Sequence, residues 1–477
     1  MKKKYLIGVD GGTQSSKVVI FDLEGEIICE GKKDLEPMSL PRQGVVEHPD
    51  DDLWDSLKAA SKEAMQRFSG RKEDILGVGL CTIRCCRALL KEDGTLAAPV
   101  MSWMDQRLAK PYEHKDPAVR YVTTSSGYIT HRMTGNFVDT VANYEGQWPI
   151  DKDTWQWSED PAVFKQYNIP REMLFDLQLP GSSAGCVTSA ASEATGIPAG
   201  IPVAITANDK AVEALGAGLL PGNTALFSLG TYITSMVHGR ENINNAEHFF
   251  SNLASVPHRY LYESAGIRRG MWTVSWMKDL LGEEAVKRAQ ASGLSTEAYL
   301  NAEGEKIPAG CCGLFTVLDW LAPPDQPYKK GLIIGFDGRH TGIHMYRSIL
   351  EGIALTMKNN AEAMHAELGL VPDKIIVSGG GSNSDLFMQI FADVFGLPAS
   401  RNVVNGAASI GAAICAAVAA GVYESFETAA GRMVKMSDTF QPAEENVELY
   451  KRLNEEIYKS IPSHTDEILK KSYPIFE

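Results

Sequence analysis

A cluster of glycines, hydroxyls and charges near the start of the chain has the residue types that bind a polyphosphate. It lies between two apolar runs and reads Asp10-Gly11-Gly12-Thr13-Gln14-Ser15-Ser16-Lys17. The glycines allow a tight turn that exposes backbone N–H groups, and the hydroxyls and the lysine add further donors. Asp10, at the end of the first apolar run, could hold a Mg²⁺ ion through water. The Walker spacing is missing, and a plain hairpin turn is the alternative interpretation.

Two further glycine motifs lie later in the chain. Leu229-Gly230-Thr231 also joins two apolar runs and, taken alone, is a generic turn. Beside the first motif it gains meaning, because two such turns could hold one phosphate chain from both sides. The run Ser378-Gly379-Gly380-Gly381-Ser382-Asn383 follows a short apolar segment. Ligands of α/β proteins lie at the carboxyl ends of strands, and small residues there leave room for a base or a ribose.

Two polar motifs have residue types that could bind or activate a second, hydroxyl-bearing ligand. Asn208-Asp209-Lys210 places a carboxylate between a strand-like and a helix-like segment, where it could act as a general base or as a helix N-cap. Trp103-Met104-Asp105-Gln106-Arg107, after Arg84, offers an aromatic face for C–H groups and charged groups for hydroxyls. A surface loop with a salt bridge is the alternative there. Arg84, Trp103, Asp105 and Asp209 all follow strand-like segments, the stretch 97–101 included, so we expect them to line one pocket.

The elements that must position these residues follow from the apolar spacing. The pattern predicts strands over 5–9, 18–22, 26–30, 75–81, 87–90, 202–206, 224–228, 232–237 and 374–377. It predicts helices over 53–68, 210–217 and 346–366, one after Ser384 that ends before Gly396, and one of small residues over 407–420 that is suited to close packing. The two strand pairs around Gly12-Thr13 and Gly230-Thr231 indicate a weak internal duplication. Strands, then a helix, then a strand favour an α/β fold.

Composition excludes several classes of protein. The chain has 477 residues, enough for two or three domains, and a net charge of −14. That charge argues against nucleic acid or an anionic membrane as the main partner. The eight cysteines form neither a CxxC pair nor a disulfide framework, which favours reduced thiols. With no signal-peptide core and no long apolar stretch, we expect a cytoplasmic protein, and a homodimer is compatible with the sequence.

Taken together, the motifs resemble, in order and over nearly the whole chain, those of the FGGY carbohydrate kinase family, the relatives of glycerol kinase and xylulokinase. The first glycine motif resembles the family's first phosphate motif, and Phe227-Ser228-Leu229-Gly230-Thr231 resembles the second. Trp103-Met104-Asp105-Gln106-Arg107 resembles the WxDxR sugar-binding element, and Asp209 matches the catalytic aspartate. The segment 331–352 resembles the second family signature, and 378–383 resembles the adenosine-binding segment.

The resemblance implies two actin-like (ribonuclease H-like) ATPase domains around a central cleft, which we expect at 1–243 and 244–477. It implies transfer of the γ-phosphoryl group of ATP to a hydroxyl of a small sugar or polyol, with Asp209 as the catalytic base. Substrate binding falls to Arg84, Trp103, Asp105 and Asp209, and Mg²⁺ to Asp10. The expected ATP-binding residues are Gly11, Gly12, Thr13, Gln14, Ser15, Lys17, Gly230, Thr231, Gly380, Gly381 and Asn383.

Departures from the family pattern leave the substrate open. Ile83-Arg84-Cys85 replaces the Gln-Met-His of xylulokinases, and Arg84 matches the arginine of glycerol and autoinducer-2 kinases. Lys210 follows the catalytic aspartate where an uncharged residue is usual, the segment from Arg107 to Thr140 is short, and a Gly-Glu-Arg-x-Pro element is missing. A ketopentose such as xylulose is our first expectation. Glycerol, erythritol, a sugar acid and autoinducer-2 stay open.

Two other classes of protein were weighed against a kinase. A non-catalytic actin-like binding protein is disfavoured because Asp10, Lys17, Asp209 and both Gly-Thr turns are retained. A dinucleotide-dependent oxidoreductase is disfavoured because no GxGxxG follows the first strand.

Overall fold

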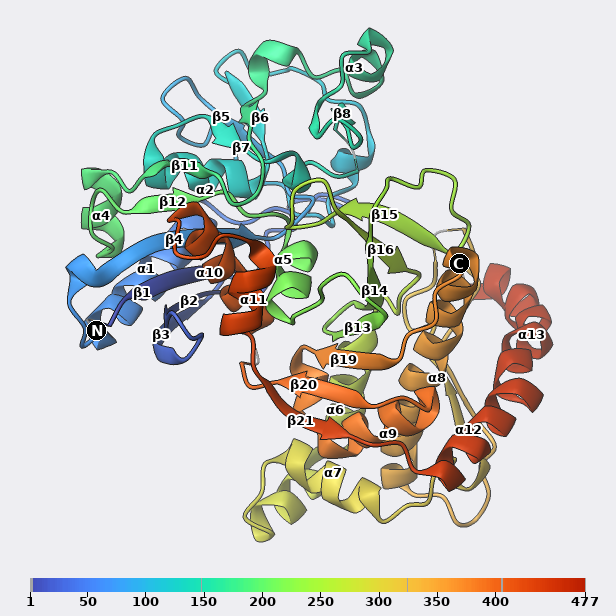
Figure 1. Ribbon diagram of the computed structural model, residues 1–477. Coiled ribbons are helices and arrows are strands. Elements are labelled where there is room, and N and C mark those ends of the chain that lie inside the picture. The colour runs from blue at the N-terminus through green and yellow to red at the C-terminus, as the bar shows by residue number, and fades with distance from the viewer. Residues whose placement is uncertain (1–2, 147, 324, 405, 477) are drawn as a thin grey trace.

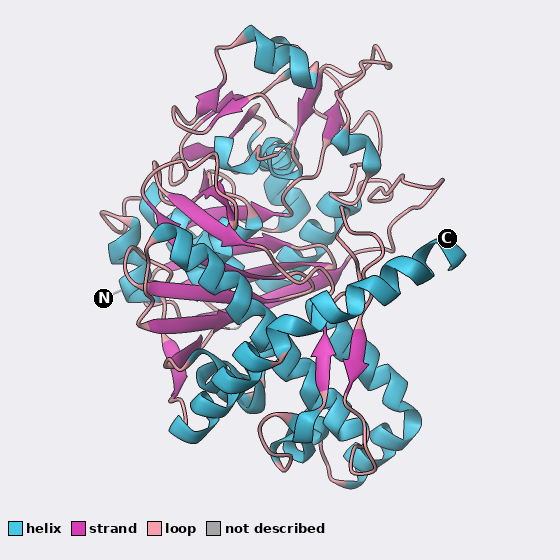
Figure 2. Cartoon of the chain, turned by 90° about the vertical axis from the view of Figure 1, so that its right-hand side faces the viewer, coloured by secondary structure: helices cyan, strands magenta, loops and turns pink. Residues whose placement is uncertain are grey.

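The apolar runs of the sequence form the strands of two mixed β-sheets in the computed structural model, which describes residues 3–146, 148–323, 325–404 and 406–476. Each sheet is the centre of one unit, and the two units lie side by side (Figure 1). Helices flank the strands in both units (Figure 2).

The first sheet has the strand order β11-β12-β4-β1-β2-β3. Strands β1, β2 and β3 are antiparallel neighbours, whereas β4 and β12 run parallel to β1. Its strands are β1 (Tyr5–Gly11), β2 (Ser15–Asp22), β3 (Ile27–Asp34), β4 (Ile75–Thr82), β11 (Ser183–Cys186) and β12 (Pro202–Ala204). Because β1 and β2 are joined directly, the first glycine motif is a hairpin turn at the ends of these two strands, as the sequence predicted.

The second sheet has the order β15-β16-β14-β13-β19-β20-β21 and repeats the plan of the first. Strands β13, β14 and β16 are antiparallel neighbours, and β19 and β20 continue parallel to β13. Its strands are β13 (Thr224–Leu229), β14 (Ile233–Gly239), β15 (Phe249–Leu253), β16 (Tyr260–Ser264), β19 (Lys374–Ser378), β20 (Ala399–Asn402) and β21 (Met436–Phe440). The shared plan agrees with the internal duplication indicated by the sequence.

The helices pack around these sheets and include all those that the apolar spacing predicted. They are α1 (Asp52–Arg67), α2 (Ser125–Thr134), α3 (Pro161–Tyr167), α4 (Ser189–Thr195), α5 (Asp209–Gly216), α6 (Gly270–Ala291), α7 (Thr296–Glu305), α8 (Gly342–Leu368), α9 (Asp385–Phe395), α10 (Ala407–Ala419), α11 (Phe426–Met433), α12 (Glu444–Glu456) and α13 (Ile461–Phe476). Ser384 caps α9 as expected, because its side chain accepts a hydrogen bond from the Phe387 N–H.

The small-residue helix α10 returns from the second unit to pack on the first sheet, beside β1 and β4 (Figure 1). A Cβ at Gly8 would overlap the carbonyl oxygen of Ser409, and one at Gly79 would overlap that of Ala412. Only glycine permits backbones to approach so closely. A domain boundary at residue 243 therefore does not separate the two sheets. Strands β13 and β14 precede residue 243 but pair within the second sheet, and α10 follows it but covers the first sheet.

Four short strand pairs lie outside the two main sheets. The predicted strand 87–90 is β5 (Ala88–Leu90), which pairs with β6 (Tyr121–Thr123) and leaves the main sheet. The other pairs are β7 (Val138–Asp139) with β10 (Asp176–Leu177), β8 (Ile150–Asp151) with β9 (Gln156–Trp157), and β17 (Phe315–Val317) with β18 (Leu332–Ile334). Together with α3, the pairs that contain β5 and β8 form an outer part of the first unit (Figure 1).

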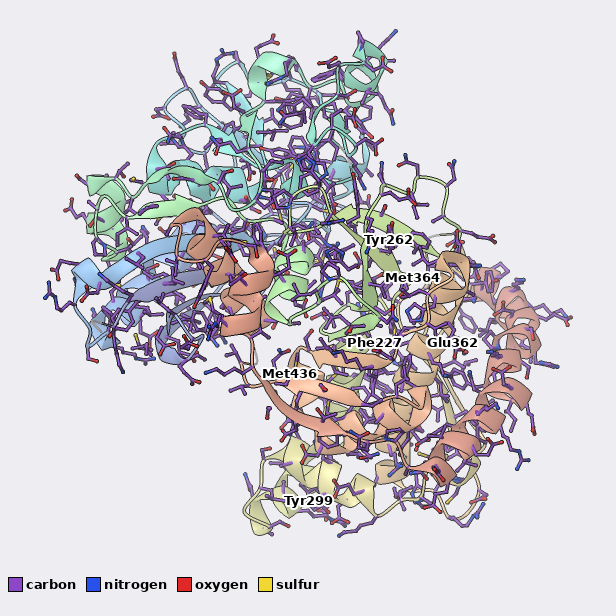
Figure 3. The ribbon with its side chains drawn as sticks, in the orientation of Figure 1. Phe227, Tyr262, Tyr299, Glu362, Met364 and Met436 are labelled. Carbon is purple, nitrogen blue, oxygen red and sulfur yellow. The ribbon has the colours of Figure 1, made fainter. Side chains whose placement is uncertain are left out.

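The core of the second unit fixes which side chains of its central strands face the first unit. Phe227 on β13 is fully buried, and its ring centroid lies 5.5 Å from that of Phe391 and 4.6 Å from that of Phe395 on α9 (Figure 3). Because side chains alternate along a strand, the next residue, Ser228, points to the opposite face of the sheet. That face is the one that α5 approaches, as the contacts of Ser228 described below show.

Candidate active site

The carboxylate of Asp209 is free for chemistry because its neighbour caps the helix. The Oδ1 atom of Asn208 accepts a hydrogen bond from the Ala211 N–H at 3.0 Å, which is the N-cap of α5. Asp209 is the first residue of that helix and accepts the Lys210 N–H at 2.9 Å. Its side chain is 32% exposed and lies 3.7 Å from Nε of Arg84. Of the two interpretations given above, the helix cap therefore belongs to Asn208.

Arg84 joins the Asp209 carboxylate to the second sheet. Its Nη1 and Nη2 atoms donate to the two carboxylate oxygens of Glu263 on β16 at 3.0 and 3.1 Å. Glu263 is 1% exposed and also accepts a hydrogen bond from Nδ2 of Asn252 at 2.6 Å. A bidentate pair of this kind fixes the plane of the guanidinium. Arg84 is therefore held rigidly between Glu263 of the second sheet and Asp209.

Burial and crowding of negative charge raise two carboxyl pKa values at this place. Burial raises the pKa of Asp209 above its ordinary value, although the nearby charges of Arg84 and Lys210 oppose the shift. Burial, together with the charges of Asp209 and Glu213, raises the pKa of Asp10 to about 7. Perturbed carboxyl groups that gather in one place are typical of functional sites.

A second polar cluster ties α5 to two strands of the second sheet. Lys210 Nζ donates to Glu213 at 2.8 Å and to Ser228 Oγ at 2.7 Å. The Glu213 carboxylate also accepts the Ser228 hydroxyl at 3.0 Å and the Ser378 hydroxyl at 2.6 Å. The two serines are register partners at the carboxyl ends of β13 and β19, directly before the second and third glycine motifs. Lys210, unusual by the family pattern, is thus neutralised by a carboxylate of its own helix.

The carboxylate of Asp105 is engaged by its own neighbours, although the residue lines a cavity together with Trp103, and its direct contact with a sugar stays a prediction. Its side chain is fully buried and accepts hydrogen bonds from the N–H of Val46 and from the N–H, Nε and Nη2 of Arg107, at 2.6 to 2.9 Å. Burial raises its pKa, but these hydrogen bonds outweigh burial and the pKa lies below its ordinary value. The stretch 97–101 that precedes it forms isolated bridges rather than a strand. Asp105 therefore orients Arg107.

Trp103 lines a cavity, and its contact with a sugar stays a prediction. The cavity has a volume of about 190 Å³, and Trp103, which is 47% exposed, shares it with Cys85, Arg87, Glu145 and Trp148. Glu145 connects this cavity to the catalytic segment, because its carboxylate accepts Nδ2 of Asn208 at 3.3 Å. Cys85 has a φ of 60°, and strained backbone of this kind is common at functional sites.

The first predicted ATP-binding turn has the expected hairpin geometry. The Gly12 N–H donates to the carbonyl of Ser15 at 3.0 Å, which closes the turn that also contains Gly11, Thr13 and Gln14. Lys17 on β2 forms an ion pair with Glu30 at 2.9 Å, and its Nζ lies near Gly406 at the start of α10. The lysine is therefore held at the end of the sheet where the turn lies.

The second and third glycine motifs lie next to each other. Gly230 and Thr231 accept hydrogen bonds from the first N–H groups of α6, from Met271 at 3.2 Å and from Gly270 at 2.8 Å. A Cβ at Gly381 would lie 2.8 Å from Leu229 of the preceding turn, whereas a Cβ at Gly380 would meet nothing within 4 Å. Gly380 and Asn383 are exposed. The open space at Gly380 is compatible with the predicted position of a base or ribose.

The donor chemistry at Asp10 fits the predicted magnesium ion. Mg²⁺ is bound through one or two carboxylates together with waters and phosphate oxygens, and Asp10 supplies one carboxylate beside Asp209 and Glu213. Among the described residues, no group of three or more His, Cys, Asp or Glu side chains is arranged to hold a metal ion. The residues therefore fit an ion that shares its ligands with a nucleotide.

Sequence reasoning does not find three carboxylates of this region, the buried Glu145 and Glu263 and the half-buried Glu213. Glu263 stands inside the apolar run Tyr260–Ser264, and an acidic residue in such a run is a signal of a paired buried charge. Glu213 lies on the predicted helix 210–217, three residues after Lys210, and i,i+3 spacing is itself a signal of an ion pair. Glu145 carries no comparable signal.

The sequence matches family models over most of its length. Residues 5–119 and 110–216 match the model described as FGGY family of carbohydrate kinases, N-terminal domain, and residues 225–420 match the C-terminal domain of the same family. An uncharacterized sugar kinase, YgcE, of Escherichia coli (strain K12) is 55% identical over 475 residues, which cover 100% of this chain and 96% of the relative. The autoinducer-2 kinase of the same strain is 25% identical, over 94% of this chain and 92% of the relative.

Solved structures share the fold. A xylulose kinase from Rhodospirillum rubrum superposes with a TM-score of 0.83 at 22% identity, covering 98% of this chain and 100% of the other. A Plasmodium falciparum glycerol kinase with ADP gives a TM-score of 0.80 at 16% identity, with coverage of 96% and 99%. At these identities the likeness establishes the two-domain actin-like architecture. None of the described helices combines the length and apolar character needed to cross a membrane.

Proposed function

The chain belongs to the FGGY family of carbohydrate kinases and is a sugar kinase that uses ATP as co-substrate, and we propose that Asp209 is its catalytic base. The observation that supports this role is the division of labour at the start of α5: Asn208 caps the helix, so the Asp209 carboxylate is free beside Arg84. In the proposed reaction Asp209 accepts the proton of the attacking hydroxyl. The oxygen–phosphorus bond to the substrate then forms as the bond to ADP breaks.

The nucleotide is proposed to lie across the three glycine motifs. Backbone N–H groups of the turns at Gly12 and Gly230 would hold the phosphates, and the open surface at Gly380 would hold the nucleoside. Lys17 would add a positive charge at the first turn. Asp10 would hold Mg²⁺, which neutralises phosphate charge when it is bound. The contacts of Ser228 and Ser378 with Glu213 support this arrangement, because they join both later motifs to the helix of Asp209.

The acceptor is proposed to be a small sugar or polyol, with a ketopentose such as xylulose as the first candidate. Trp103 and the cavity that it lines, connected to Asn208 through Glu145, provide the space for its carbon chain. We also propose a cytoplasmic location, where ATP is available and where the eight free cysteines would remain reduced.

A substrate panel tests the proposal. The purified protein is incubated with ATP, Mg²⁺ and, in turn, xylulose, ribulose, glycerol, erythritol, gluconate and autoinducer-2, and ADP release is coupled to NADH oxidation. We expect turnover with one class of acceptor and a loss of roughly 10²- to 10⁴-fold after Asp209→Asn. A turnover rate in this variant close to that of the wild type would refute Asp209 as the base. Nucleotide binding without turnover on any acceptor would favour a non-catalytic actin-like binding protein.

A further inference from the structure

The charge of Arg87 sets it apart from the other cations around the cavity. Arg84 is paired with Glu263, and Arg107 is paired with Asp105 and Glu47. Arg87 lines the cavity and is 4% exposed. Among the described residues its guanidinium makes no ion pair and no hydrogen bond, and its Nε is buried without a partner.

The surroundings of Arg87 hold it in place without neutralising it. Its backbone pairs with Met101 in both directions, at 3.1 and 2.9 Å. Its guanidinium lies over the ring of Trp148, 5.2 Å from the centroid. Burial lowers the pKa of Arg87 to about 10, so the side chain is still charged at neutral pH. Asp105 and Tyr112 face it, but the Asp105 carboxylate is already occupied by Arg107.

A buried charge without a partner is costly, and a ligand that brings a carboxylate to it would offset that cost. We propose that Arg87 binds a carboxylate on the sugar, so that the preferred acceptor is a sugar acid. This inference rests on the proposed function, and it makes a sugar acid, rather than a neutral ketopentose, the first candidate for the acceptor. The carboxylate of the acceptor would pair with Arg87 inside the cavity, and the hydroxyl to be phosphorylated would lie toward Asp209.

Asp105 and Glu145 are the carboxylates in the cavity that could oppose an anionic ligand; Arg107 neutralises Asp105, which leaves Glu145. Burial raises its pKa to about 7, so a large fraction of it is protonated near neutral pH. Its oxygens also accept hydrogen bonds from Asn208 and from the Leu253 N–H. The Glu145 carboxylate is thus engaged by these two donors rather than by Arg87. Glu145 therefore leaves the cavity open to an acid.

Direct binding measurements test the proposal without any turnover. The probes are two aldonates, gluconate and xylonate, and their neutral counterparts sorbitol and xylitol, which have the same chain lengths without a carboxylate. Dissociation constants are measured by calorimetry at pH 7.5 for the wild type, Arg87→Met and Arg87→Lys. Charge-assisted hydrogen bonds predict that at least one aldonate binds about 10- to 150-fold more tightly than its alditol. Arg87→Met should abolish this difference, and Arg87→Lys should retain part of it.

Thermal unfolding separates a ligand-binding role from a structural one. If the role of Arg87 is to bind a ligand, Arg87→Met removes an unpaired buried charge from the ligand-free protein. The ligand-free variant should then unfold at the same temperature as the wild type or at a higher one. A lower unfolding temperature would indicate that Arg87 supports the fold. The proposal is refuted if no aldonate is preferred over its alditol or if the preference survives Arg87→Met. Aldonate binding without phosphorylation would refute the proposed kinase reaction on acids but leave the binding site standing.

Discussion

Replacing Asp209 with asparagine removes the proposed base while leaving its surroundings almost unchanged. Asparagine has nearly the same volume, and its Oδ1 can still accept the Lys210 N–H that Asp209 accepts at 2.9 Å. The cap of α5 is unaffected because Asn208 supplies it. Arg84 keeps its bidentate pair with Glu263. We therefore expect Asp209→Asn to fold normally and to bind nucleotide as well as the wild type does.

The expected loss of rate follows from the role of a positioned general base. Such a base contributes roughly 10²- to 10⁴-fold to a proton-transfer step, which corresponds to about 3 to 5 kcal/mol of activation free energy. The assay is kcat with saturating ATP and the acceptor identified by the substrate panel. The matched control is Asp52→Asn, because Asp52 is also the first residue of a helix, α1, and lies outside the site. A kcat for Asp209→Asn within tenfold of the control would refute the assignment.

Three further predictions concern the nucleotide side of the site. Gly380→Val should raise KM for ATP with little effect on stability or on KM for the sugar, because a Cβ at Gly380 would meet nothing in the protein; an unchanged KM would place the nucleoside elsewhere. Lys210→Met should lower kcat by up to about 10²-fold, because it removes the hydrogen bond from α5 to Ser228, leaves Glu213 without its cation and so misplaces Asp209; Lys306→Met, at an exposed i,i+3 pair, is the control in the same assay. The pKa of Asp10, ordinarily 3.8, is raised to about 7, so its stabilising contribution is complete below about pH 4 and is lost as pH rises through about 7; thermal unfolding without nucleotide or divalent cation should show that Asp10→Asn flattens this decline.

Much of the fold could be predicted because its strands are short apolar runs joined by glycine turns. The hairpins around Gly12 and Gly230 follow from local pattern alone. What local pattern could not show is the return of α10 to the first sheet. The contact between Gly8 and Ser409 joins residues about 400 positions apart, and neither segment indicates which other segment it packs against. Glycines in a buried strand indicate a close neighbour, but not which one.

The candidate site, like the fold, could be predicted from the sequence only in part. The proximity of Arg84 and Asp209 could be predicted because both follow parallel strands of one sheet, β4 and β12, whose carboxyl ends meet. The position of Glu263 could not be predicted, because Glu263 belongs to a strand of the other unit, β16, and its pairing with Arg84 depends on how the two units meet. The engagement of the Asp105 carboxylate by Arg107 could not be predicted either. Sequence alone does not show whether a carboxylate is free or is used by an arginine two positions away.

The departures from the family pattern differ in whether the structure compensates them. Lys210 adds a positive charge beside the catalytic group, but Glu213 on the same helix neutralises it, so the charge presented to an acceptor changes little. Cys85 brings no carboxylate of its own beside Arg84, and Glu263 supplies one to Arg84 from the second sheet. Arg87 is not one of these departures, but its charge has no such compensation among the described residues. Because only an uncompensated charge changes what a cavity attracts, Arg87 is the residue at which the acceptor preference should differ from that for a neutral sugar.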